Sequence, residues 1–145
     1  MIGKARTLSG LAQGLTAGVT NLAEEFWPGL LTFNLPQNQS LSWDLGDGGY
    51  LKNFVVRMPN QIQTLEVLNA TGPLAIASAT FAGEAPIRTA MNPHHLEVLD
   101  IGELESGPLS TVVVQTGEKL LLSRVGAITL EELRKVDSAI ELAKE

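Results

Sequence analysis

The sequence predicts an α/β fold with a twisted, open, mixed sheet and flanking helices. Segments with the period of a strand alternate with segments of helical periodicity along the chain. Residues 74–77 form a wholly apolar run, which is typical of a strand covered on both faces. Two further apolar runs flank residues 116–119, a pattern that indicates an antiparallel hairpin. A sheet with both kinds of pairing is therefore expected.

Length and composition predict one globular domain over residues 1–145. Hydrophobic residues make up 44% of the chain, enough to bury a sizeable core at this length. No apolar run approaches the roughly 20 residues of a membrane span, and no signal-peptide pattern follows Met1. Cysteine is absent, which excludes disulfides and thiolate metal sites. We expect a cytoplasmic protein without membrane association.

The charge balance limits the classes of partner. Sixteen acidic and ten basic side chains give a net charge of -6, which argues against extended contact with nucleic-acid phosphates. Two arginines, Arg57 and Arg124, nevertheless stand within strand-like runs rather than on a solvated helix. Either could bind an anion, and pairing of Arg57 with a surface carboxylate is the alternative.

In the first half of the chain, glycine and proline residues mark where helices and strands end. Its periodicity predicts roughly these elements: helices at 7–14 and 17–26 with a break near Thr16, a strand at 30–35, a surface loop or hairpin at 37–52, a strand at 54–58, and a helix of about ten residues that includes Ile62, Leu65 and Leu68. Trp27 is expected to pack in the core or at a hinge, with ligand stacking as the alternative.

The second half predicts more strand than helix. Its elements are a strand at 74–77, a Ser/Thr loop at 78–86, a short helix at 89–96, a strand at 98–101, hairpin strands at 111–114 and 120–124, and a terminal helix that starts at a Thr129/Glu132 capping box and extends through Ile140.

The loop after residues 74–77 is the first candidate site. Open α/β sheets bind ligands beyond the carboxyl ends of their strands, where Ser78 and Thr80 stand. The competing interpretation is a turn in which these hydroxyls cap backbone groups. No metal site is expected, because residues 44–49 lack the spacing of a calcium loop and His94-His95 lacks a third ligand.

Five short motifs occur in order along the chain. They are Phe-Trp-Pro-Gly-Leu-Leu-Thr at 26–32, Val-Arg-Met-Pro at 56–59, Gly-Pro-Leu at 72–74 with Ser-Ala-Thr at 78–80, Ser-Thr-Val-Val at 110–113, and Arg-Val-Gly-Ala-Ile at 124–128. In this order and spacing, from near residue 1 to about Leu133, the chain resembles the YrdC-like family of threonylcarbamoyl-AMP synthases.

The resemblance implies a YrdC-like sheet that lacks the family's N-terminal segment. It also implies synthesis of threonylcarbamoyl-AMP from threonine, bicarbonate and ATP, with release of pyrophosphate. ATP with Mg²⁺ would be a co-substrate, and no permanent cofactor is implied. The product serves the threonylcarbamoyladenosine modification of tRNA, although the acidic charge makes direct tRNA binding by this chain unexpected.

The resemblance also assigns roles to individual residues. Carried over position by position, Arg57, Ile76 and Ser110 would bind threonine, Asn53, Ser78 and Arg124 would bind ATP, and Arg57 and Ser78 would be the catalytic residues. The chemistry agrees, because a guanidinium can pair bidentately with a carboxylate and hydroxyls can donate to phosphate. Positioning and charge stabilisation supply most of the catalysis in such a reaction.

The departures from the family pattern leave alternatives open. The family's Lys-x-Arg segment is absent, and Thr80, Val114, Val125 and Asn53 replace its usual Asn, Asp, Pro and Thr. A catalytically inactive relative that binds threonine, a nucleotide or a protein partner is therefore the alternative, and an RNA-binding module is a third. A sheet without its N-terminal strands would need cover from a second copy or a partner chain.

Overall fold

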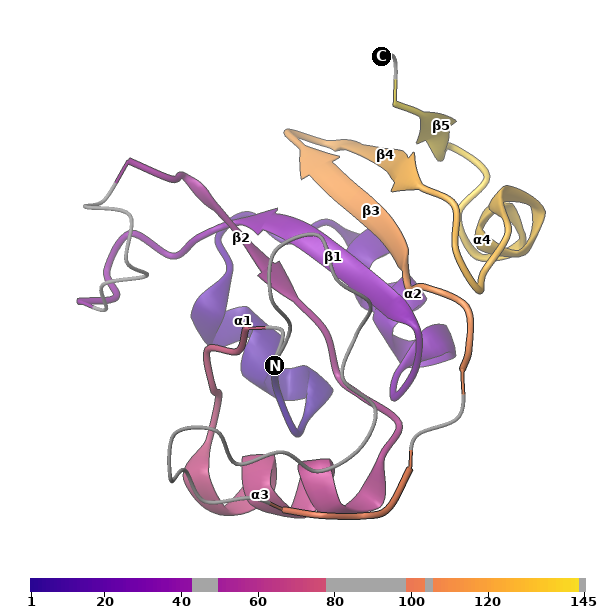
Figure 1. The fold of residues 1–145 in the computed structure, drawn as a ribbon. Helices are drawn as coiled ribbons and strands as arrows, with labels where there is room; N and C mark the ends of the chain where they lie inside the picture. The colour runs from indigo at the N-terminus through magenta and orange to yellow at the C-terminus, as the bar shows by residue number, and fades with distance from the viewer. Residues whose placement is uncertain (43–49, 78–98, 104–105, 144–145) are drawn as a thin grey trace. The chain divides into compact units, whose positions relative to one another are not determined.

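The computed structural model describes residues 1–42, 50–77, 99–103 and 106–143 (Figure 1). The chain divides into two compact units, Met1–Ala75 with Leu109–Glu145, and Ile76–Pro108. The described elements all belong to the first unit: η1 Ala5–Thr7, α1 Leu8–Leu11, α2 Ala17–Phe26, β1 Leu31–Pro36, β2 Asn53–Val56, α3 Ile62–Thr71, β3 Thr111–Thr116, β4 Lys119–Arg124, α4 Leu130–Val136 and β5 Glu141–Leu142.

The five strands form one mixed sheet in the order β2-β1-β3-β4-β5. The β1/β2 and β3/β4 pairs are antiparallel, whereas β1/β3 and β4/β5 are parallel. Gly117 has φ +59 between β3 and β4, a left-handed conformation that glycine adopts without steric cost. The predicted mixed sheet and its hairpin are thus confirmed.

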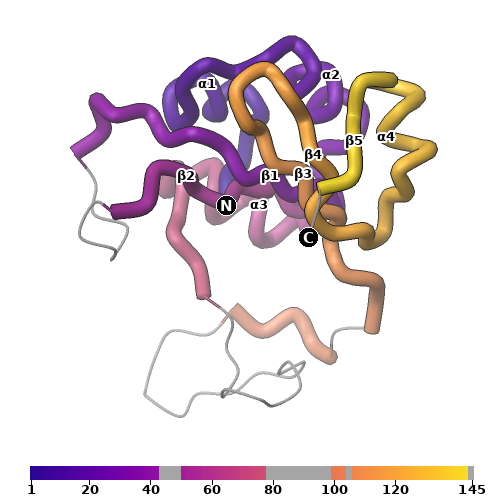
Figure 2. Tube along the Cα trace, turned by 90° about the horizontal axis from the view of Figure 1, so that it is seen from above, coloured from indigo at the N-terminus to yellow at the C-terminus, as the bar shows by residue number. Residues whose placement is uncertain are grey.

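The hydrophobic core lies on one face of this sheet. Side chains alternate along a strand, so every second residue of β1 points to the core. Figure 2 shows α1 and α2 on the same side of the central strands. The fully buried members of this core include Val19, Leu22, Leu31, Phe33, Leu35, Val113, Leu133 and Ile140.

Local signals set the limits of the helices that cover the core. The side chain of Thr16 accepts a hydrogen bond from Val19 N at 3.4 Å and caps the N-terminus of α2. This agrees with the predicted break between the two helices near Thr16. Thr129 and Glu132 form the predicted capping box of α4. In α2, a Cβ on Gly18 would collide with Asp137 and with Leu120 Cδ1, so glycine permits this close approach.

Two predicted helix ends are wrong. The helix expected at 7–14 ends at Leu11, because Gln13 N donates to Pro36 O at 2.9 Å and ties the following chain to β1. The terminal helix ends at Val136 rather than including Ile140. Ile140 instead lies buried in the core, just before β5.

Trp27 is a core residue, as expected. Its ring is buried and meets Phe33 edge to face, with centroids 5.2 Å apart. The indole Nε1 donates to Leu31 O at 2.7 Å, so its polar atom is satisfied by the sheet. This contact leaves the indole no stacking role toward a ligand.

The expected strands at 74–77 and 98–101 are not present in the described residues. Residues 74–77 form no ladder, and Ile76 is 60% exposed. Leu99 is exposed, and Gly102 N donates to Asp100 Oδ1 at 2.8 Å in a turn with φ +86 at the glycine. Leu74 exchanges two hydrogen bonds with Met1, at 3.1 and 2.7 Å, but neither run forms a strand among the described residues. Apolar composition alone does not supply a pairing strand.

Several predictions fall outside the described residues. They concern the calcium-like loop at 44–49, the Ser/Thr loop at 78–86 including Ser78 and Thr80, the helix at 89–96, and His94-His95. Within the described ranges, no helix has the length and apolar character needed to cross a membrane.

Candidate functional site

The sheet has a second face, opposite the core, that carries most of the predicted site residues. In β1 this face holds Thr32 and Asn34, which alternate with the core residues. The register across the strands defines its other members. We call this surface the site face; it comprises Thr32, Asn34, Asn53, Val55, Ser110, Val112, Val114, Leu121 and Arg124, with Arg57 directly after β2.

Strand directions bring three predicted residues to one end of the site face. Arg57 follows the end of β2, Ser110 precedes β3, and Arg124 is the last residue of β4. Because β2 runs antiparallel and β3 parallel to β1, and β4 antiparallel to β3, these three positions meet where β1 begins. Residues far apart in the sequence are thus collected at one sheet edge.

Arg57 is half-buried without a counter-ion among the described residues. It comes two positions after Val55, so alternation directs it to the site face. Its Nε is buried and has no hydrogen-bond partner in the described part of the chain. Desolvation lowers the pKa of the Arg57 guanidinium from its ordinary value. A half-buried cation without a partner is suited to receive an anionic ligand.

Ser110 and Arg124, predicted for different ligands, are in direct contact. Arg124 Nε and Nη2 donate to Ser110 O at 3.0 and 2.9 Å, and Nη2 also donates to Ser110 Oγ at 3.0 Å. Thr32 Oγ1 donates to the same Ser110 Oγ at 2.9 Å. The buried Ser110 hydroxyl thus accepts two hydrogen bonds, and its own proton is left to donate to a ligand acceptor.

The loop after β4 fixes this arrangement from the core side. Thr111 Oγ1 donates to Ile128 O at 2.6 Å and accepts from Gly126 N and Ile128 N at 3.0 and 2.9 Å. A Cβ on Gly126 would lie 2.5 Å from the Ser110 carbonyl carbon, a separation that real structures do not tolerate. Gly126 therefore lets the loop pack against the Ser110 backbone.

Asn53, the fourth predicted residue on the site face, lies away from this end. Asn53 shares the site face but pairs with Pro36 at the opposite end of β2, about 13 Å along the strand from Arg57 by the usual rise per residue. Ile76 begins the second compact unit and is exposed there, and Ser78 is outside the described residues. The ligand-binding roles of Ile76 and Ser78 therefore stay predictions.

Two polar residues of the site face, Thr32 and Asn34, were not predicted as site residues. Thr32 orients the Ser110 hydroxyl, and the Oδ1 of Asn34 is buried without a hydrogen-bond partner in the described residues. Their signal is the alternation of polar Thr32 and Asn34 with Leu31, Phe33 and Leu35. Period-two reading of residues 31–35 would have placed both opposite the core.

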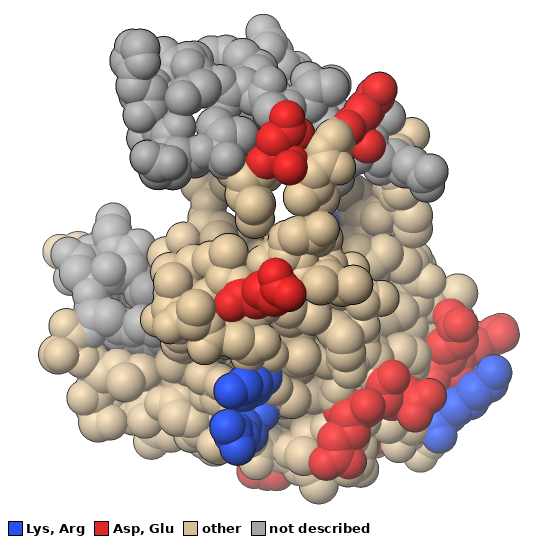
Figure 3. Space-filling view, turned by 90° about the horizontal axis from the view of Figure 1, so that it is seen from below, with Lys and Arg blue, Asp and Glu red and all other residues tan. Residues whose placement is uncertain are grey.

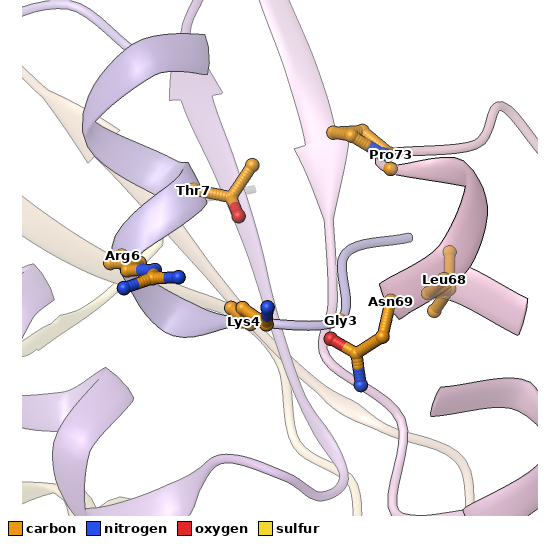
Figure 4. A pocket seen from close by; sticks show the side chains of 8 residues that line it. Gly3, Lys4, Arg6, Thr7, Leu68, Asn69 and Pro73 are labelled. Atoms are coloured by element: carbon orange, nitrogen blue, oxygen red, sulfur yellow. The ribbon is translucent and has the colours of Figure 1, made fainter. Parts of the chain in front are cut away.

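A separate cavity of about 190 Å³ lies between the N-terminal segment and the end of α3 (Figure 4). Polar side chains of Lys4, Arg6, Thr7 and Asn69 line it together with glycine and apolar residues. At Gly3 it is narrow, since a Cβ there would lie 3.0 Å from Asn69 Oδ1. None of the predicted site residues contributes to this cavity.

Charged side chains do not form a continuous basic surface on the face shown in Figure 3, where Lys and Arg gather at separate places among acidic residues. The described residues also contain no group of three or more His, Asp or Glu side chains placed to hold a metal ion. Among the described residues, the face shown in Figure 3 therefore offers no broad basic patch to a polyanion.

Comparisons with known proteins agree with the arrangement of the sheet. A model of the Sua5/YciO/YrdC family, described as "Telomere recombination", matches residues 1–126. The chain is 32% identical over 142 residues to a putative threonylcarbamoyl-AMP synthase of Mycobacterium tuberculosis, covering 94% of this chain and 64% of that protein. It is 31% identical to the threonylcarbamoyl-AMP synthase of Pyrococcus abyssi, covering 91% of this chain and 40% of that protein.

Solved structures show the same fold. The crystal structure of Pyrococcus abyssi Sua5 complexed with L-threonine is similar with a TM-score of 0.82 and 30% identity, covering 98% of this chain and 43% of that one. A H234A/Y235A variant of the same Sua5 is similar with a TM-score of 0.81. The chain therefore spans less than two thirds of these relatives, and over that span it belongs to the Sua5/YciO/YrdC family.

Proposed function

We propose that this chain forms the threonine-binding part of a threonylcarbamoyl-AMP synthase. The observation that carries the proposal is the half-buried Arg57 guanidinium, whose Nε has no hydrogen-bond partner among the described residues, at the same sheet end as the buried Ser110 hydroxyl. A threonine carboxylate would pair with Arg57, and the Ser110 hydroxyl would donate to a threonine oxygen. The relatives' names and the threonine complex of a similar structure support this choice of ligand.

The proposed reaction joins threonine to bicarbonate and then to AMP. The amino nitrogen of threonine forms a bond to the bicarbonate carbon with loss of water, giving a carbamate. A carbamate oxygen then attacks the α-phosphorus of ATP, and pyrophosphate leaves. In this proposal ATP arrives with Mg²⁺ as a substrate, bound by Asn53, Ser78 and Arg124, and the protein contributes by positioning and charge stabilisation. The product would serve tRNA modification.

A second candidate is a relative that binds threonine, a nucleotide or a partner without catalysis. It is favoured by the departures from the family pattern, which place Val114 and Val125 where the family usually has Asp and Pro. A second copy or a partner chain on the site face is the corresponding proposal for assembly.

Calorimetric titration with threonine and with Mg²⁺–ATP, followed by an assay of pyrophosphate release, tests both candidates. We expect threonine to bind, and Arg57→Gln to weaken binding roughly 10- to 100-fold through loss of a charged hydrogen-bond donor. Lys135→Gln, which removes a cation from exposed α4, is the matched control and should leave binding unchanged.

The outcomes separate the candidates. Threonine-dependent pyrophosphate release would support the synthase, and threonine binding without release would support the non-catalytic relative. If threonine fails to bind, or if Arg57→Gln and Lys135→Gln behave alike, Arg57 is not a ligand-binding residue and the proposal is wrong.

A further inference from the structure

Asn34 places a buried, unpartnered hydrogen-bond acceptor on the site face. Its Oδ1 is buried and has no hydrogen-bond partner among the described residues. Such an atom loses its water without receiving a donor in return, which costs free energy of folding. An acceptor kept in this condition beside a binding residue calls for a donor that arrives with a ligand.

The position of Asn34 relates it directly to Arg57. Asn34 pairs with Val55 of β2, and Arg57 follows Val55 by two residues, so the two polar residues are diagonal neighbours on the same face. Diagonal neighbours have Cβ atoms about 7–8 Å apart, which long polar side chains can bridge through a small ligand. Among the described residues, the site face thus holds an unpartnered donor, Arg57 Nε, and an unpartnered acceptor, Asn34 Oδ1, on residues at diagonal positions.

This pairing matches the chemistry of an α-amino acid. The carboxylate accepts hydrogen bonds, and the amino group on the adjacent carbon donates them. On the same side of Asn34 as Arg57, toward the start of β1, Thr32 contacts the Ser110 hydroxyl, which provides a third polar point. Three points of different chemistry define the orientation of a chiral ligand.

We propose that Asn34 is a specificity-determining residue whose Oδ1 accepts a hydrogen bond from the α-amino group of the substrate. The inference rests on the proposed threonine site and adds the residue that recognises the amino group. An amide suits this task because it accepts an N–H without adding charge. The amino nitrogen can therefore lose a proton and keep its lone pair for attack on bicarbonate, whereas a carboxylate would favour the protonated form.

The test compares two ligands that differ only in the amino group. Threonine and 3-hydroxybutanoate share the carboxylate and the hydroxyl, and the second ligand has hydrogen in place of the amino group. Both are titrated calorimetrically into the full chain, into Asn34→Val, and into the matched control Val114→Ala. Val114 pairs with Asn34 on the site face but has no acceptor, so its truncation changes packing alone.

We expect the wild-type chain to prefer threonine over 3-hydroxybutanoate. Asn34→Val should bind threonine roughly 5- to 30-fold more weakly, yet bind 3-hydroxybutanoate within about twofold of wild type. Val114→Ala should change both affinities by the same factor. Asn34→Asp, which retains an oxygen acceptor, should retain the preference for threonine. If Asn34→Val does not fold, Asn34→Ala takes its place in the same comparison.

Other outcomes would overturn the inference. Equal losses for the two ligands in Asn34→Val, or an unchanged preference for threonine, would mean that Asn34 is a structural amide satisfied by water. Wild-type binding of both ligands with equal affinity would show that the amino group is not recognised, while leaving the proposed threonine site in place. If the wild-type chain binds neither ligand, the proposed function fails and this inference fails with it.

Discussion

The two faces of β1 differ in how they treat polar atoms. On the core face, Leu31, Phe33 and Leu35 are fully buried and carry no polar side-chain atom. On the site face, Thr32 donates to Ser110, and the Oδ1 of Asn34 is buried without a partner in the described residues. Adjacent residues of one strand therefore have different roles. Side chains alternate between the two faces, so one face stabilises the fold and the other is available for binding.

The largest expected effect comes from truncating the core face. Phe33→Ala removes a fully buried ring together with its edge contact to Trp27. We expect the free energy of unfolding to fall by about 3–5 kcal/mol, as measured by urea denaturation followed by circular dichroism. A loss below about 1 kcal/mol would mean that this face is not the core.

A smaller loss is expected from Thr111, one of the buried polar residues on the core face. Thr111→Val removes the hydroxyl that holds Gly126 and Ile128, and leaves their backbone groups without that partner. We expect a loss of about 1–3 kcal/mol in the free energy of unfolding. Val113→Thr, two residues later on the same face, is the matched control, because it adds a hydroxyl to the core where Thr111→Val removes one. If Thr111→Val is neutral, water replaces the hydroxyl.

The same kind of substitution on the site face should have the opposite sign. Asn34→Val removes a buried acceptor that lacks a partner and introduces a residue favoured in strands. We expect the free energy of unfolding to rise by about 1 kcal/mol, even though threonine binding weakens. A destabilised Asn34→Val would show that the amide is satisfied in the free protein.

The smallest effect concerns the exposed capping box of α4, which belongs to neither face. Hydrogen bonds from the Thr129 N–H and hydroxyl lower the pKa of Glu132 below its ordinary value of 4.5. The folded pKa is depressed, so this stabilisation is present above the unfolded pKa and is lost as the pH falls through the folded pKa. We expect wild type to be more stable than Glu132→Gln at about pH 6 and the difference to shrink by about pH 3. A difference that does not change with pH would exclude the ionised carboxylate as its cause.

Much of the fold could be predicted from local signals. The polar loop with Gly117 between two apolar runs predicted the β3/β4 hairpin, and Thr129 with Glu132 predicted the start of α4. These features depend on residues within one or two turns of chain, where backbone geometry and capping decide the outcome. Motif order also led to the family to which the chain belongs.

The candidate site was predicted only in part. Arg57, Ser110 and Arg124 were singled out, and the structure collects all three at one end of the site face. Their mutual contacts were not predicted, because Ser110 and Arg124 meet only through the pairing of β3 with β4. Asn34 was missed because no motif contains it, and the absence of a partner is visible only in three dimensions.

The sequence by itself determined where most helices and strands begin, because caps, glycines and periodicity act over a few residues. Tertiary structure alone decided which apolar runs are buried. Among the described residues, residues 74–77 form no strand and Ile76 is exposed, whereas Ile140, outside any helix, is fully buried against the sheet. Burial depends on which distant parts of the chain pack together. Apolar composition shows that a segment can be buried, but it does not determine which segment it packs against.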